Sequence, residues 1–277
     1  MSLKSNTETL RQLIYLFFFH LGAVILLTVL TQVGGVAYLL AVALAWRIRG
    51  GFLRRAGIFF ASFLFLYGAV STGAYFAAAS YGRQPLPCLQ TEEAVLAAQS
   101  PFYCILNRHY VRNDLHQLTR DLAEHMNKKF PGTVTLTLDG NFPLFDEFSM
   151  LPHLSHNDGR KLDLAFYYQD KEGQYLRGET KSPIGYWGFE GEEICVGNYP
   201  MCWDMQWFQI FVRDLDLDTE RTGAVLKWLY TEGRQQGVEK IFIEPYVAKR
   251  LKANSDIVRY QGYNAARHDD HIHFQIK

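Results

Sequence analysis

The chain has 277 residues, which is enough for one or two domains. Its 28 basic and 28 acidic residues give a formal net charge of zero, so bulk electrostatics gives no reason to expect nucleic-acid binding. Hydrophobic residues make up 48% of the chain, and they are concentrated in two long uncharged runs near its start.

These two runs predict membrane-spanning helices. No Asp, Glu, Lys or Arg occurs between Arg11 and Arg47, and none occurs from Ala56 to Gly82. A bilayer crossing needs about 20 apolar residues, so the first run is interpreted as a helical hairpin turning near residues 32–35, and the second as one span. Runs of this length disfavour a buried core helix or a cleaved signal peptide. Residues 1–80 are therefore expected to form an all-α transmembrane anchor of about three helices.

The distribution of basic residues predicts the topology. Basic residues favour the cytoplasmic side, and they flank the first run at both ends, with Arg11 before it and Arg47 after it. If that run crosses twice, the next span exports everything after about Tyr81. The expected location is then the bacterial inner membrane, with the C-terminal domain in the periplasm and the lipid bilayer as a partner. A single tilted crossing would instead leave that domain in the cytoplasm.

All four cysteines follow the last apolar run, which agrees with export. An even count in an oxidising compartment suggests two disulfides. Proximity along the chain favours Cys88–Cys104 and Cys195–Cys202, although four cysteines permit three pairings.

The remaining chain carries the signals of one α+β domain. Residues 81–106 contain two closely spaced prolines and are predicted to be a linker, and residues 107–277 to be the domain. Residues 180–205 are interpreted as a long loop. Because hairpins outnumber strand–helix–strand units, a small antiparallel sheet is expected. Helices are predicted at residues 109–130, 222–236 and 246–253, and strands at 133–138, 162–168, 241–243 and 271–276.

Five of the nine histidines lie in two clusters, His153 with His156 and His268 with His271 and His273. Imidazoles and a carboxylate are the ligands that hold Zn²⁺, and a catalytic zinc site has three protein ligands and one open position. Successive side chains of a strand face opposite ways, so two of the last three histidines share one face of strand 271–276. This spacing alone leaves open whether both bind one metal.

A carboxylate inside a strand completes the possible ligand set. Asp163 lies on the face of strand 162–168 opposite Leu162 and Leu164, where an unpaired carboxylate needs a partner. His156 precedes it by seven residues, and Gly159 between them allows the chain to fold back. Together the two clusters predict a shared metal site.

His156, Gly159 and Asp163 resemble part of the signature of the LAS metallopeptidases. That group includes D-Ala-D-Ala carboxypeptidases, penicillin-insensitive murein endopeptidases and the hedgehog signalling domain. The C-terminal His-Asp-Asp-His-Ile-His-Phe resembles the murein endopeptidase branch most closely, as do His153 and the run Lys240–Pro245. Two features differ from that family. Residues 264–267 lack the aromatic residue and glycine expected before the last histidine cluster, and the family's periplasmic enzymes are soluble, without a membrane anchor. The resemblance covers residues 107–277 and implies a zinc peptidase domain.

The resemblance also implies a role for each residue. His156, Asp163 and His273 would bind zinc. His271 would act near the metal-bound water as a base or a transition-state stabiliser, with His268 as a second catalytic histidine. His153 would be auxiliary, and the aromatic residues Tyr186, Trp187, Trp203 and Trp207 could line the cleft.

The expected function is hydrolysis of peptide cross-links in peptidoglycan by a membrane-anchored zinc peptidase. One alternative is a D,D- or L,D-carboxypeptidase that trims stem peptides. Another is a hedgehog-like, non-catalytic module that contains zinc and binds the cell wall, and a third is a membrane scaffold that binds wall polymer. No oligomeric state is predicted.

Overall fold

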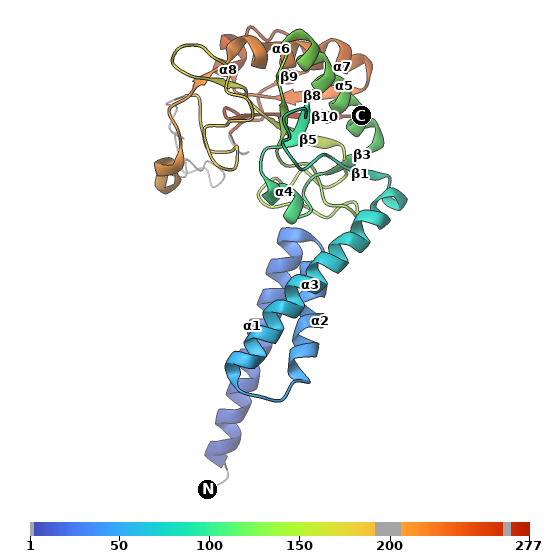
Figure 1. Cartoon of the computed structure of the whole chain (residues 1–277), viewed down its shortest axis with the longest axis vertical. Helices are drawn as coiled ribbons and strands as arrows, with labels where there is room; N and C mark the ends of the chain where they lie inside the picture. Colours follow the sequence, from blue (N-terminus) through green and yellow to red (C-terminus); the bar gives the residue numbers. More distant parts are fainter. Residues whose placement is uncertain (1–2, 192–205, 263–266) are drawn as a thin grey trace. The chain divides into compact units, whose positions relative to one another are not determined.

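The computed structural model describes residues 3–191, 206–262 and 267–277. It divides into two compact units, Met1–Ala79 and Ser80–Lys277. The first unit is helical (Figure 1), with α1 at Leu3–Thr31, α2 at Gly34–Trp46 and α3 at Phe52–Ala78.

The predicted hairpin forms between α1 and α2. The chain turns at Gln32, which has a positive φ of 66°. A Cβ atom on Gly35 would lie 2.0 Å from Thr28 Oγ1, so only glycine allows α2 to approach α1 this closely. Across the hairpin, His20 Nδ1 and Tyr38 Oη are 2.7 Å apart and share a hydrogen bond.

In the described part of the chain, two segments are long and apolar enough to cross a membrane, Leu10–Thr31 and Phe52–Tyr81. The 13 residues of α2 are apolar but fewer. At a rise of about 1.5 Å per residue they span about 20 Å, whereas a bilayer core is about 30 Å thick. The prediction of about three spans is therefore supported for two segments only, because the turn after Thr31 leaves the second arm of the hairpin short.

A six-stranded sheet forms the centre of the second unit, in the order β2-β4-β5-β10-β8-β9. The four inner strands pair antiparallel, as expected, but β2 and β9 pair parallel at the two edges. The fold is thus mixed α+β with a mixed sheet. The six strands are β2 (Leu96–Ala98), β4 (Thr135–Thr137), β5 (Lys161–Ala165), β8 (Val238–Phe242), β9 (Val258–Arg259) and β10 (His271–Ile276).

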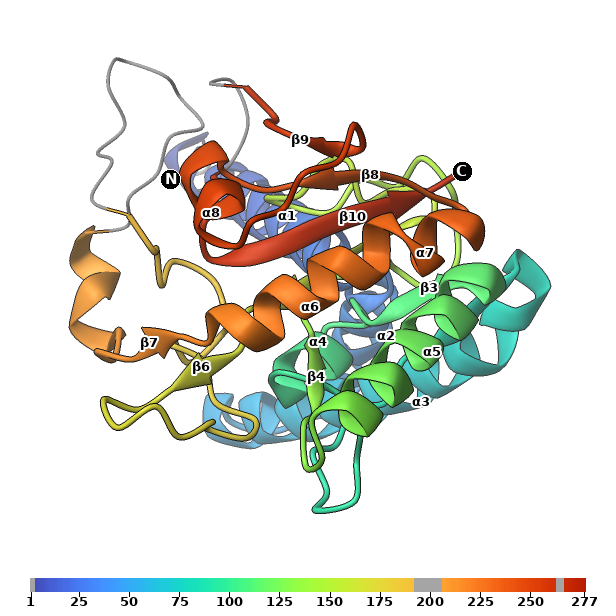
Figure 2. The ribbon, with the colours of Figure 1, turned by 90° about the horizontal axis from the view of Figure 1, so that it is seen from above.

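Two helices pack on one face of this sheet, α5 at Asn113–Lys129 and α6 at Thr219–Tyr230 (Figure 2). Helix α5 buries residues at three- and four-residue steps, including Leu115, Leu118 and Leu122. These meet the alternate strand residues Leu162, Leu164, Ile272, Phe274 and Ile276 in one core. The residues that alternate with these core positions, Asp163 in β5 and His271 and His273 in β10, lie on the opposite face of the sheet.

Shorter elements surround this core. Two more pairs of strands are β1 (Arg83–Pro85) with β3 (Tyr110–Arg112) and β6 (Tyr168–Gln169) with β7 (Asp216–Leu217). The remaining helices are η1 (Ala79–Tyr81), α4 (Pro101–Ile105), η2 (Gln206–Phe211), α7 (Glu232–Gln235) and α8 (Pro245–Arg250).

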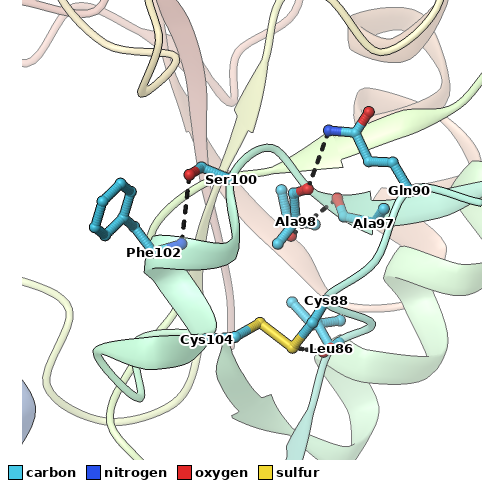
Figure 3. Close-up of a disulfide and its surroundings, with 9 residues drawn as sticks. Leu86, Cys88, Gln90, Ala97, Ala98, Ser100, Phe102 and Cys104 are labelled. Carbon is cyan, nitrogen blue, oxygen red and sulfur yellow. Dashed lines mark hydrogen bonds between the residues drawn. A yellow bond between two sulfur atoms is a disulfide. The ribbon is translucent and has the colours of Figure 1, made fainter.

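The segment that we predicted as a linker, residues 81–106, carries β1, β2 and α4 and belongs to the second unit. A disulfide joins Cys88 to Cys104 in α4 (Figure 3), as proximity suggested. The Ser100 hydroxyl caps α4 by accepting a hydrogen bond from the Phe102 amide. The other expected pair, Cys195–Cys202, lies outside the described residues.

Candidate metal centre

The register of β5 and β10 brings two of the expected ligands together. His273 lies directly opposite Asp163 in the antiparallel pair, and His271 lies opposite Ala165. Directly opposed side chains on one face have Cβ atoms about 4.5–5.5 Å apart. His273 Nδ1 accordingly lies 2.8 Å from Asp163 Oδ1, and both side chains are buried.

His156 reaches the same point from the loop before β5. Its Nδ1 lies 2.7 Å from the Gly140 carbonyl oxygen. A carbonyl only accepts hydrogen bonds, so Nδ1 must carry a proton, which leaves Nε2 as the nitrogen that can bind a metal. That Nε2 lies 3.1 Å from His273 Nδ1 and 3.4 Å from Asp163 Oδ1.

Three potential ligand atoms therefore form a small triangle with edges of 2.8, 3.1 and 3.4 Å. Bonds of about 2.0–2.1 Å at tetrahedral angles require edges of about 3.3–3.4 Å. The triangle thus has the donor types of a zinc site and nearly its size. Burial lowers the pKa of His156, but the Asp163 carboxylate outweighs it and raises the pKa, so a metal cation between the two side chains would take the place of a proton.

His153 offers a second set of three ligands. His153, His156 and Asp163 each present a ligand atom within 4.8 Å of the others, so this group could also hold a metal ion. His153 Nδ1, however, lies 2.9 Å from Asp139 Oδ2 as well as 3.2 Å from Asp163 Oδ2. A nitrogen between two carboxylates acts as a hydrogen-bond donor, so His153 would have to bind a metal through its other nitrogen, Nε2. His273 Nδ1, in contrast, already lies beside both other ligand atoms, which favours His273 as the third ligand.

Asp139 is held by an arginine that the sequence did not single out. Arg108 donates two hydrogen bonds of 2.6 Å to this carboxylate, and both side chains are buried. Burial raises the pKa of Asp139, but Arg108 and His153 outweigh it and lower the pKa from its ordinary value. The Asp139 anion therefore fixes His153 beside the centre. Asp139 directly follows the strand predicted at residues 133–138, but nothing in the sequence marked it as part of the site.

Tyr186 closes the centre from the loop after β6. Its hydroxyl donates to Asp163 Oδ2 at 2.7 Å and accepts from the Asp139 amide at 3.1 Å. Burial raises the pKa of Tyr186 well above its ordinary value, so the hydroxyl keeps its proton for this contact. Asp163 is thereby held on both carboxylate oxygens.

His271 is oriented by its neighbour in the chain. Its Nδ1 pairs with the Asp270 carboxylate, so Nδ1 carries a proton and Nε2 is the ring nitrogen left to meet other groups. Nε2 is buried and has no hydrogen-bond partner among the described residues, and it lies 3.8 Å from Asp163 Oδ2. Burial lowers the pKa of His271, but Asp270 and Asp163 raise it further, to about 9, so without a cation beside Asp163 the ring also carries a proton on Nε2. An unpaired buried nitrogen here is suited to meet a ligand or a water molecule.

The other histidines complete the cluster. The ring of His268 lies 4.8 Å from that of His271 and 5.4 Å from that of His273. Burial and these two neighbours lower the pKa of His268 well below its ordinary value, so this ring is neutral. Burial raises the pKa of Asp163, but the nearby histidines outweigh it and hold the pKa well below its usual range.

The structure thus brings together all six residues expected at the site from its two sequence clusters, and adds Asp139, Arg108 and Asp270. Tyr186 and Trp187 line a cavity beside the centre, whereas Trp207 is exposed and is not among the lining residues. Trp203 lies outside the described residues.

Comparison with known proteins adds no family assignment. The resemblance to zinc peptidases therefore rests on the two motifs and stays a prediction. No protein-family model matches this chain, and no curated protein matches it.

Proposed function

We propose that the chain is a membrane-anchored, zinc-dependent peptidase that hydrolyses peptide cross-links in peptidoglycan. The observation that carries this proposal is the pairing of a ligand triangle with an unpaired histidine nitrogen beside it. His156, Asp163 and His273 would hold the ion, and His271 Nε2 would face the reacting groups. Bound zinc supplies a Lewis acid that lowers the pKa of a coordinated water to about 7 and polarises an amide carbonyl.

The chain's own residues would move the proton. Zinc held by Asp163 would offset one of the two carboxylates that raise the pKa of His271 and so favour a neutral ring. His271 Nε2 would then take the proton of the attacking water while its Nδ1–H stays on Asp270. The water oxygen bonds to the carbonyl carbon, the carbon–nitrogen bond breaks, and Nε2 returns the proton to the leaving amine. Neutral His268, next to His271, would stabilise charge in the transition state as the second catalytic histidine.

The location and the substrate are parts of the same proposal. The Cys88–Cys104 disulfide supports an exported domain, and the two candidate spans support a membrane anchor. Export requires that α2 also crosses the membrane, because two crossings alone would return the domain to the cytoplasmic side. A domain in the periplasm would meet peptidoglycan directly, and the histidine motifs resemble those of enzymes that cut its cross-links.

The test uses the purified full chain in detergent micelles with muropeptide dimers, followed by mass analysis. Dimers should become monomers, with loss of activity after chelation and no effect of β-lactams. His271→Gln should retain its metal and lose activity by a factor on the order of 10²–10⁴. His125→Gln, a change on α5 away from the cluster, is the matched control.

Three other outcomes would replace the proposal. Loss of a terminal D-Ala from stems with dimers intact would indicate a carboxypeptidase. Bound metal without any turnover would indicate a binding module. Loss of the metal with the His271 side chain would make that residue a ligand instead of a base.

A further inference from the structure

A cavity of about 580 Å³ opens beside the metal centre, and His153 and His271 form part of its wall. A dry apolar cavity of about 150 Å³ is enough to hold benzene, so this one has room for a much larger group. Most of its remaining wall is apolar. The apolar and aromatic lining residues are Phe102, Tyr103, Leu106, Leu151, Pro152, Leu154, Ile184, Tyr186, Trp187 and Phe189.

The charged groups in the described wall are already paired. Arg108 holds Asp139 through two hydrogen bonds. Arg267 pairs with Asp269, and its guanidinium stacks on Phe189 at 4.1 Å from the ring centroid. The Asp270 carboxylate accepts from His271 and from the Trp187 amide. Apart from His271 Nε2, which the proposed function assigns to the scissile amide, the described wall therefore offers a charged ligand no free counter-ion. Its mostly apolar surface favours an uncharged apolar group.

The exposed part of the cavity wall is apolar as well. Phe102, Leu151 and Leu154 line the cavity and remain 61%, 49% and 52% exposed. Clustered exposed apolar side chains mark surfaces that meet a partner or a membrane. The second candidate span ends at Tyr81 and β1 begins at Arg83, which is at most about 7 Å of chain. A domain tethered this closely stays near the bilayer, where aliphatic chains are the abundant apolar group.

We propose that this cavity binds an extended aliphatic chain of the substrate. The amide that is cut would carry an acyl or alkyl chain on one side of the scissile bond, with water as the co-reactant and a carboxylic acid and an amine as products. This inference rests on the proposed hydrolytic function and narrows its substrate class. The methyl side chain of alanine would leave most of the cavity empty, so unmodified stem peptides should be cut more slowly than acylated ones.

The first test uses the zinc-loaded full chain in phospholipid nanodiscs. Its substrates are Ala-Ala peptides that carry acetyl, butanoyl, hexanoyl or octanoyl groups, with a second series of alkylamides at the other end. In one of the two series, kcat/KM should rise by roughly fourfold per added methylene until the cavity is filled. If kcat/KM does not change with chain length in either series, the inference is overturned. Faster cleavage of aromatic peptides with the same number of carbons would overturn the choice of an aliphatic chain.

Two neighbouring positions at the end of α4 give a matched pair of variants. Leu106 lines the cavity, and exposed Ile105 does not. Leu106→Trp should fill the cavity and abolish the dependence on chain length, while Ile105→Trp should keep it. If Leu106→Trp keeps the full dependence, or if both variants lose it, the cavity is not the chain site.

A binding measurement separates this inference from the proposed function. Octanamide should bind to the chelator-treated full chain, and Leu106→Trp should weaken that binding at least tenfold. Cross-link hydrolysis without octanamide binding would overturn the inference and leave the proposed function standing. Octanamide binding without hydrolysis of any peptide would overturn the proposed function, and with it the assignment of the chain to a substrate.

Discussion

His273→Ala and His153→Ala distinguish the two sets of three ligands that the structure offers. The sets share His156 and Asp163 and differ in the third member. Among the described residues, His273 Nδ1 forms hydrogen-bond contacts only with the other two ligand atoms, whereas His153 Nδ1 is also held by Asp139. We therefore expect zinc binding to be lost in His273→Ala and retained in His153→Ala.

The size of the effect follows from linkage between binding and folding. An ion present at 1,000 times its Kd stabilises the folded state by about 4 kcal/mol. For a unit of the size of Ser80–Lys277, each kcal/mol shifts the Tm by about 2–4 °C. Zinc should thus raise the Tm of the unchanged chain and of His153→Ala by about 8–16 °C, and it should not raise that of His273→Ala.

The assay is thermal unfolding of the chelator-treated full chain in micelles, with and without excess zinc, together with metal analysis after gel filtration. His125→Ala serves as a control for the loss of a histidine away from the cluster. If the increase in Tm with zinc disappears in His153→Ala but persists in His273→Ala, the third ligand is His153 and not His273. A zinc shift of equal size in all three variants would refute the metal centre.

Three further predictions concern the second unit. Arg108→Leu leaves the buried carboxylate of Asp139 unpaired, so the free energy of unfolding should fall by about 3–5 kcal/mol; denaturant titration should show little change for Arg234→Leu, which breaks an exposed ion pair. Burial lowers the pKa of His109 to about 4, below the unfolded value of about 6.5. The folded state then binds fewer protons, and stability present above about pH 6.5 should decline by roughly 2–3 kcal/mol by about pH 4.5. His109→Gln should flatten this part of the pH profile of chelator-treated protein, and an unchanged slope would contradict the assignment. A reporter active only in the periplasm should be active when fused at Lys277, and activity of a cytoplasm-only reporter there would reverse the proposed topology.

Local patterns in the sequence were sufficient for the features that depend on near neighbours. The alternation in His271–Ile276 predicted a strand with histidines on one face, and β10 has those bounds. The helix predicted at residues 109–130 is confirmed as α5 from Asn113 on, whereas residues 110–112 form β3 instead. The short separation of Cys88 and Cys104 predicted their disulfide. Each of these depends on backbone periodicity or on a short loop, which neighbouring residues determine.

Contacts between distant segments decided the rest. The register that places His273 opposite Asp163 joins residues 110 positions apart, and a shift of one residue would turn His273 to the other face. The pairing of Arg108 with Asp139, the parallel edge strands and the cavity beside His271 likewise depend on how loops and strands pack. The sequence by itself determined which side chains were available for a metal centre, because ligand chemistry belongs to each residue. Only the tertiary structure decided which of their nitrogen and oxygen atoms converge, because that depends on strand register and on the hydrogen bonds that orient each ring.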